Sequence, residues 1–122
     1  MFLILNHQQL DIYQSSKALV YECYRLTKLL PSEERFGLIS QIRRAALSVH
    51  LNIAEGSSRK SEAERKRYYE ISRGSIIEID AALDIAVGLD YLPSFDANPL
   101  NKEIVNCFKM LSGLIDSKKP AS

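Results

Sequence analysis

The sequence contains few of the residues that interrupt helices, with only five glycines and four prolines among 122 residues. It has no tryptophan, no segment alternates between apolar and polar residues as a strand does, and no apolar run approaches the ~20 residues of a membrane-spanning helix. The apolar residues 1–5 lack the basic leader of an export signal. These absences argue against a β protein, a membrane protein and an exported one, so we expect a helical protein in the cytoplasm.

Hydrophobic residues make up 46% of the chain and charged residues 25%, which are ordinary values for a folded globular protein. A chain of this length buries one core, so residues 1–122 are expected to form a single domain. The only cysteines, Cys23 and Cys107, fall on apolar helix stripes far apart in sequence. We therefore expect buried free thiols rather than a disulfide or a metal-binding pair.

Apolar residues recur at three- and four-residue steps in four segments, which predicts helices over about residues 10–30, 32–55, 61–88 and 98–117. Residues that commonly cap or break helices mark the ends: Pro31 and Ser32, Gly56, the capping box of Ser61 and Glu64, and Asn98 with Pro99. Short connections make successive helices antiparallel. The sequence thus predicts an all-α fold, an antiparallel up-down-up-down four-helix bundle.

The second predicted helix is apolar on two faces, whereas a bundle helix needs only one. One face carries Leu38, Ile42, Ala46, Val49 and Ile53, and the nearly opposite face carries Phe36, Leu47, Leu51 and Ala54. On the third helix, Gly74, Ala81 and Gly88 recur every seven residues and form a ridge of small side chains. The ridge serves either the bundle itself or a second copy of the chain. Taken with the second helix, it makes self-association the preferred hypothesis.

Basic residues gather between positions 43 and 73, where eight of them accompany four acidic ones, although the whole chain has a net charge of only +1. A basic surface of this kind holds nucleic acid through its phosphates, without reading sequence. The residues proposed for this role are Arg43, Arg44, Arg59, Lys60, Arg65, Lys66 and Arg67. The alternative is an ordinary solvated helix start. Tyr68 and Tyr69 follow the basic run, but they lie on the apolar arc and are predicted to be core tyrosines.

Catalytic and metal-binding patterns are missing from the sequence. Neither His7 nor His50 follows a glutamate at the spacing of a di-metal bundle site, so both are interpreted as surface or packed residues. There is no phosphate loop, no paired cysteine motif and no nucleophile with an adjacent base. We expect no enzymatic activity, no cofactor, no metal and no small-molecule substrate.

Several short motifs in the second and third helices carry a family resemblance: residues 34–38 (ERFGL), 41–45 (QIRRA), 52–56 (NIAEG), 73–75 (RGS) and Glu78, with LDYL at 89–92. In combination they resemble the bacterial four-helix-bundle proteins encoded by intervening sequences in 23S ribosomal RNA genes. One departure is His50, where the family often has proline. The resemblance implies a cytoplasmic homopentamer without known enzymatic activity. It also implies kinship with accessory proteins of diversity-generating retroelements, which work with a reverse transcriptase and RNA.

The motif residues include the polar stripe between the two apolar faces of the second helix. Buried polar groups need partners, so we predict a buried polar network made of Gln41, Asn52, Glu55, Arg73 and Glu78. The leading hypothesis is a non-enzymatic oligomeric bundle that binds RNA or a ribonucleoprotein. The alternative is a protein-interaction scaffold, for a partner such as a polymerase, without direct nucleic-acid binding. An enzyme with an unrecognised site is a third, weaker hypothesis.

Overall fold

The computed structural model describes residues 2–117, which form four α-helices, two short 3-10 helices and no strand. The α-helices are α1 (Asp11–Thr27), α2 (Leu38–Ser57), α3 (Glu62–Gly88) and α4 (Asn98–Asp116). The 3-10 helices are η1 (Asn6–Gln9) and η2 (Ser32–Glu34). The predicted all-α fold of four helices is confirmed.

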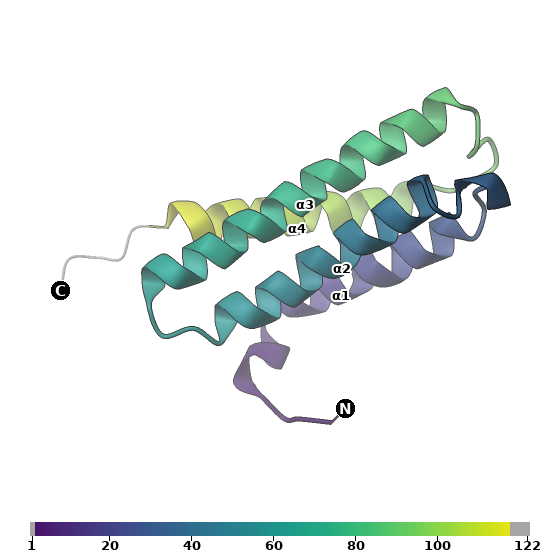
Figure 1. Cartoon of the computed structure of the whole chain (residues 1–122). Coiled ribbons are helices and arrows are strands. Elements are labelled where there is room, and N and C mark those ends of the chain that lie inside the picture. The colour runs from purple at the N-terminus through teal and green to yellow at the C-terminus, as the bar shows by residue number, and fades with distance from the viewer. Residues whose placement is uncertain (1, 118–122) are drawn as a thin grey trace.

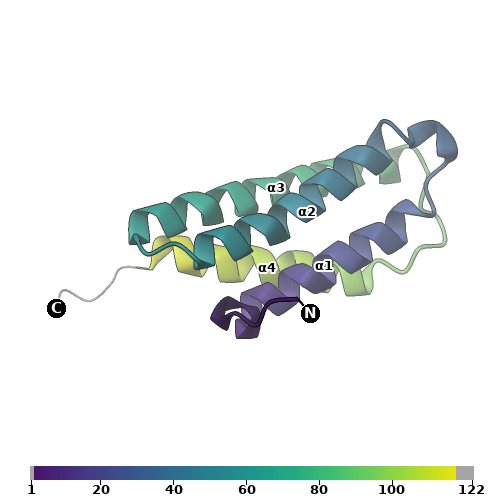
Figure 2. The same cartoon turned by 60° about the horizontal axis from the view of Figure 1, so that its bottom comes forward.

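The helices pack side by side as an elongated bundle (Figure 1). Helix α1 contacts α2 and α4, and α3 contacts the same two helices from the other side. The connections that join α1 to α2 and α3 to α4 lie at one end of the bundle, and the α2–α3 connection lies at the other end (Figures 1 and 2). Among the described residues, no helix is both long enough and apolar enough to cross a membrane.

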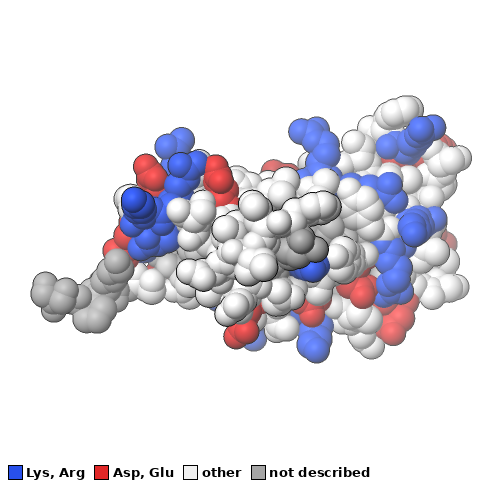
Figure 3. Space-filling model, turned by 90° about the horizontal axis from the view of Figure 1, so that it is seen from below, with Lys and Arg blue, Asp and Glu red and all other residues white. Residues whose placement is uncertain are grey.

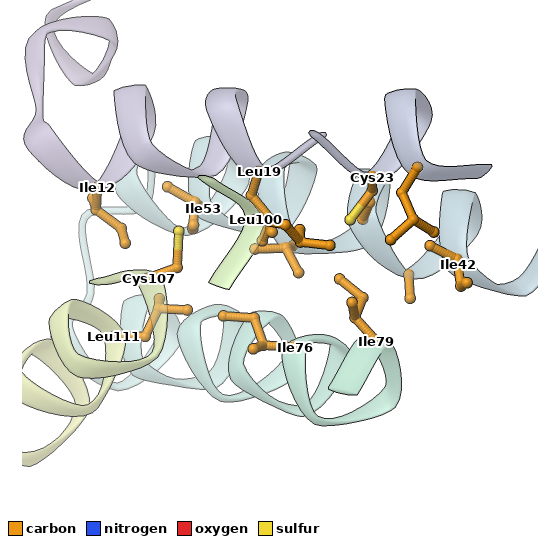
Figure 4. Packing of buried hydrophobic residues seen from close by; sticks show 14 of the residues in the cluster. Ile12, Leu19, Cys23, Ile42, Ile53, Ile76, Ile79, Leu100, Cys107 and Leu111 are labelled. Carbon is orange, nitrogen blue, oxygen red and sulfur yellow. The ribbon is translucent and has the colours of Figure 1, made fainter. Parts of the chain in front are cut away.

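All four α-helices contribute to one hydrophobic core (Figure 4). Leu19 of α1, Ile53 of α2, Ile79 of α3 and Leu111 of α4 are completely shielded from solvent. Each such side chain stabilises the fold by about 1.5–3 kcal/mol relative to leaving it exposed. The core-facing residues are those of the three- and four-residue periodicity, which explains why the sequence predicts the helices.

Cys23 and Cys107 lie inside this core as free thiols, as predicted (Figure 4). Burial raises the pKa of each thiol to about 12, with smaller contributions from Glu22 beside Cys23 and from Glu103 beside Cys107. Because the thiolate is the reactive form, both cysteines behave as small apolar core residues.

Several of the predicted helix ends differ in the structure; at the start of α4, for example, Ala97 rather than Asn98 is the N-cap residue. Of the capping box predicted for α3, the structure shows the half made by Ser61, whose hydroxyl accepts a hydrogen bond from the Glu64 N–H at 3.3 Å. Ser32, in contrast, begins only the short helix η2, and α2 starts later, at Leu38. The first turn of α2 is capped by Glu34, whose carboxylate accepts from the Leu38 N–H at 3.1 Å. A carboxylate at this end also suits the helix dipole.

Gly56 is a buried residue inside α2 rather than the glycine that ends it, since the helix continues to Ser57. A Cβ atom at this position would stand only 2.8 Å from the Cβ of Tyr68 and 3.3 Å from the carbonyl oxygen of Arg65. Glycine is needed here because α2 and α3 approach each other closely. The neighbouring Tyr69 is a core tyrosine as predicted, with its hydroxyl 2.9 Å from the Ser57 hydroxyl. Tyr68, also predicted to be a core tyrosine, is only half-buried, and its hydroxyl accepts a hydrogen bond from Arg59 at 3.1 Å.

Candidate functional site

The outer face of α2 is an exposed apolar stripe. Ile42, Val49 and Ile53 on the inner face are fully buried, whereas Leu47 and Leu51 on the outer face are 37% and 60% exposed. Phe36, just before the helix, is 89% exposed. The two apolar faces predicted from the sequence are therefore both present, and the bundle itself covers only one. We call Leu47, Leu51 and Ala54 the α2 stripe.

The ridge of small residues on α3 also faces away from the bundle. Around an added Cβ at Gly74 or Gly88 there is no heavy atom within 4 Å, and Ala81 between them is exposed. Ile77 and Ile85, beside the ridge, are 56% and 55% exposed. No helix of the same chain therefore uses the space that these small residues leave. We call Gly74, Ala81 and Gly88, with the flanking Ile77 and Ile85, the α3 ridge.

A polar groove of about 300 Å³ lies between α2 and α3 and reaches the ridge at Gly74. The Gln41 side-chain amide donates to a Glu78 carboxylate oxygen at 3.3 Å across this groove. Deeper in the groove, the Ser75 hydroxyl donates to the Ser48 hydroxyl at 2.8 Å. Arg44 also lines the groove, with its side chain exposed. Several motif residues of the sequence thus meet on one open face of the molecule.

The five residues predicted to form a buried polar network do not form one within the chain. Gln41, Glu55 and Glu78 are exposed, and Glu55 pairs with Arg59 at 2.6 Å near the end of the helix. Asn52 donates to the Ser48 carbonyl oxygen of its own helix at 2.8 Å. Arg73 points to the other side of α3, where it donates to the Ser112 hydroxyl of α4 at 3.1 Å.

The buried polar contacts between α2 and α3 are made instead by serines that the sequence reasoning missed. The Ser72 hydroxyl is fully buried and donates to the Val49 carbonyl oxygen at 2.8 Å, and Ser75 is 6% exposed. In the sequence, the burial of these serines is indicated only by their position on the same helix face as Tyr69, Ile76 and Ile79. Small hydroxyl side chains allow the two helices to approach closely while each hydroxyl still finds a partner.

Five of the seven proposed nucleic-acid-binding residues lie around the α2–α3 connection, at one end of the bundle, and Figure 3 shows basic side chains at both ends of the molecule, mixed with acidic ones. We call these five residues the basic end; they are Arg59, Lys60, Arg65, Lys66 and Arg67. Acidic side chains lie among these basic ones. Lys66 pairs with Glu62 at 3.3 Å, and Arg59 pairs with Glu55.

Within the basic end the side chains differ in how far they are already engaged. Arg65 donates to the carbonyl oxygens of Arg59 and Lys60 at 3.0 and 2.7 Å, so it holds the connection in shape. Lys60 and Arg67 are exposed. These two are the basic side chains at this end that are best placed to meet a phosphate.

Arg43 and Arg44 lie along α2, away from the basic end. The Arg43 Nε–H donates to the Thr27 hydroxyl at 2.8 Å, and its guanidinium carbon stands 4.6 Å from the centroid of the Tyr24 ring. Such a cation–π contact ties α2 to α1 and makes Arg43 a packing residue. Arg44 lines the polar groove. The seven basic residues therefore do not form one continuous surface.

His50, predicted to be a surface or packed residue, packs between α1 and α2. Its Nδ1 atom lies 2.7 Å from the Ser16 hydroxyl, and its ring centroid lies 4.5 Å from that of Tyr13. Burial lowers the pKa of His50, and the nearby positive charges of Lys17 and His7 lower it further. The ring of His7 in turn lies 5.5 Å from that of Tyr13. Within residues 2–117, no three potential metal ligands cluster together.

These features define a small helical bundle protein with an open face on α2 and α3 and a basic end. A family model described as "23S rRNA-intervening sequence protein" matches residues 8–113, which is most of the chain. The chain therefore belongs to the 23S rRNA-intervening sequence protein family, as its motifs predicted. No curated protein matches the chain.

Proposed function

We propose that the protein is a non-enzymatic bundle that assembles into a closed ring of identical chains through the open faces of α2 and α3. The main support for this proposal is the α3 ridge, where Gly74 and Gly88 leave space that no part of the chain fills. Glycine inside a helix, as at Gly74, costs about 1 kcal/mol relative to alanine, and a closely approaching neighbour offsets that cost. A homopentamer of up-down-up-down bundles, as the family resemblance implies, is the ring that we propose.

Ring assembly also gives the motif residues a role. Gln41, Arg44 and Glu78 lie in the open at the polar groove of a single chain. Neighbouring subunits, one against the stripe and one against the ridge, would enclose this groove and turn its polar side chains into the buried network that they do not form alone. Buried polar groups then fix how the subunits register, because a misplaced neighbour leaves them without partners.

We further propose that the basic end associates with RNA or a ribonucleoprotein. In a cyclic ring the same end of every bundle faces the same side, so the exposed Lys60 and Arg67 of each chain add to one basic surface. Phosphate contacts of this kind give affinity without sequence readout. The family description, which refers to 23S rRNA, supports an RNA setting.

A protein-interaction scaffold without direct RNA contact is the second candidate. It is favoured by the pairing of basic groups at this end, since Arg59 and Lys66 already have carboxylate partners and Arg65 binds backbone carbonyls. Exposed ion pairs of this kind contribute little to stability. They leave fewer free charges for phosphates than the sequence alone suggests.

Assembly is tested by placing a long charged side chain on the ridge. Ala81→Arg is accommodated by the single chain, because Ala81 is exposed, but it would clash with a neighbour. The matched control is Ala97→Arg, at an exposed position outside the face. Light scattering should give a multiple of the 13.8 kDa chain mass for the parent protein and the control, and the single-chain mass for Ala81→Arg. A single-chain mass for the parent protein at high concentration would contradict the proposal.

RNA association is tested by measuring binding to a structured RNA across salt concentrations. Phosphate contacts should make the affinity fall steeply with salt, and Lys60→Ala/Arg67→Ala should weaken binding and flatten the salt slope by about one to two per chain. The control is Lys28→Ala/Lys102→Ala, which removes two exposed positive charges elsewhere. Binding that is absent or independent of salt would favour the scaffold.

A further inference from the structure

An apolar N-terminal arm, residues 2–5, projects from the bundle with its side chains in solvent. Phe2 and Ile4 are 103% and 95% exposed, and Leu3 and Leu5 are 63% and 42% exposed. The arm lies on the side of α1 and α2, where the N-terminal segment leaves the bundle (Figures 1 and 2). Contiguous exposed apolar residues of this kind mark an interaction site.

The base of the arm is held in place by the chain that carries it. The Leu5 N–H donates to the Gln8 side-chain oxygen at 3.1 Å, and the Gln14 side-chain amide donates to the Gln8 carbonyl oxygen at 2.8 Å. The His7 ring lies against Tyr13 on α1. A fixed base holds the arm in an outward orientation before any partner binds, which lowers the entropic cost of binding.

An apolar groove of about 350 Å³ lies between α3 and α4. Its lining consists of five apolar residues with one charged residue of each sign: Ile76, Ile77, Ile104, Val105, Phe108, Asp80 and Lys109. Ile77, Val105 and Phe108 are between 39% and 56% exposed. We call this hollow the α3–α4 groove.

We infer that the N-terminal arm of one chain binds in the α3–α4 groove of a second copy. The inference rests on the ring assembly proposed above and adds the contact that links neighbouring chains. The arm does not reach the groove of its own chain, because η1 packs against α1 and α2 whereas the groove lies between α3 and α4. A cyclic ring of more than two chains needs two different complementary patches on each chain. The arm and the groove are such a pair.

The two patches also continue the open faces already described. Leu5 and His7 line a hollow that they share with Leu51 and Ala54 of the α2 stripe. Ile77 belongs both to the α3–α4 groove and to the α3 ridge. A neighbour whose ridge lies over the stripe would therefore present its groove close to the point where the arm leaves the bundle.

The area of the arm is large enough to matter for assembly. Its four side chains expose on the order of 500 Å², because a fully exposed Phe or Ile each presents roughly 150–200 Å². A stable interface buries about 800 Å² per partner. Covered completely by a neighbour, the arm would supply more than half of that area, and the stripe and ridge would supply the remainder.

The contact is tested by disulfide cross-linking between two differently tagged, co-expressed chains, one carrying Ile4→Cys and the other Val105→Cys. Oxidation should link the two tags in one covalent pair. The buried native thiols, with pKa values raised to about 12, react too slowly to interfere. In the control, Lys28→Cys replaces Val105→Cys. Lys28 is exposed and lies in the connection between α1 and α2, so this pair of chains should give no linked product.

The outcomes separate this inference from the assembly on which it rests. A parent protein with a single-chain mass overturns both. An assembled protein without a cross-link overturns the arm contact alone.

A second measurement does not depend on cysteine geometry. Phe2→Ser/Ile4→Ser should raise the dissociation constant of the assembly at least about tenfold, since it removes two exposed apolar side chains that the contact would bury. The control Tyr21→Ser/Leu29→Ser removes two apolar side chains, 63% and 56% exposed, from α1 and the turn after it. Equal dissociation constants for the arm variant and the parent protein, with the same helical content by circular dichroism, would reject the contact.

Discussion

The inner contact between α2 and α3 differs sharply from the outer face of the same two helices. On the inside, an added Cβ at Gly56 would stand 2.8 Å from Tyr68, and the buried Ser72 hydroxyl bonds to α2. On the outside, Gly74 has no neighbour within 4 Å of an added Cβ. The same residue type is thus required by the fold at one position and left unexplained by the fold at the other. The comparison shows which face is complete in one chain and which face needs a partner.

The largest expected effect comes from filling the inner contact. Gly56→Val should lower the free energy of unfolding by about 2–3 kcal/mol, because the branched side chain forces α2 and α3 apart against close packing. Urea denaturation at fixed protein concentration measures the loss. A stability unchanged from the parent protein would show that the inner contact is looser than the distances indicate.

A smaller effect of opposite sign is expected on the outer face. Gly74→Ala should raise the free energy of unfolding by about 1 kcal/mol when measured at low protein concentration, since alanine favours the helix and meets nothing in the chain. The measurement is the same urea titration. A destabilisation by Gly74→Ala in the single chain would remove the difference between the two faces.

The smallest effect concerns the α1–α2 contact at His50, which neither face includes. Its folded-state pKa lies below the ordinary 6.5, so the unfolded chain takes up a proton at higher pH than the folded chain. The stability contributed by neutral His50 is therefore present above pH 6.5 and is lost as the pH falls through that value towards the folded-state pKa. Urea midpoints at successive pH values should show this fall, and His50→Gln should reduce its slope. An identical slope in both proteins would mean that His50 does not titrate differently on folding.

Much of the bundle follows from the sequence because local periodicity and capping chemistry decide it. Leu19, Ile42, Val49 and Ile53 are buried where the three- and four-residue spacing places them, and Ser61 caps α3. The exposed stripe at Leu47 and Leu51 likewise follows from counting apolar faces. These features depend on residues near one another in the chain.

The features that sequence reasoning missed depend on contacts between distant residues. Glycine commonly ends a helix, so the sequence places the end of α2 at Gly56. Only the close approach of Tyr68 explains why a glycine stands inside the helix at this position. From the sequence, Arg43 is indistinguishable from a surface charge. Its packing role is visible only in the structure, where Tyr24 and Thr27 of α1 lie beside it. The polar motif residues similarly have partners that no periodicity reveals, such as Ser112 beside Arg73.

The short connection between α2 and α3, residues 58–61, bears on the order in which the chain folds. Closing so small a loop costs little chain entropy, and the two helices that it joins share the close Gly56–Tyr68 approach and the Ser72 hydrogen bond. Contacts that are local in sequence form fastest. This helix pair should therefore form the nucleus onto which α1 and α4 condense, so changes at the pair slow folding whereas changes in α4 mainly speed unfolding.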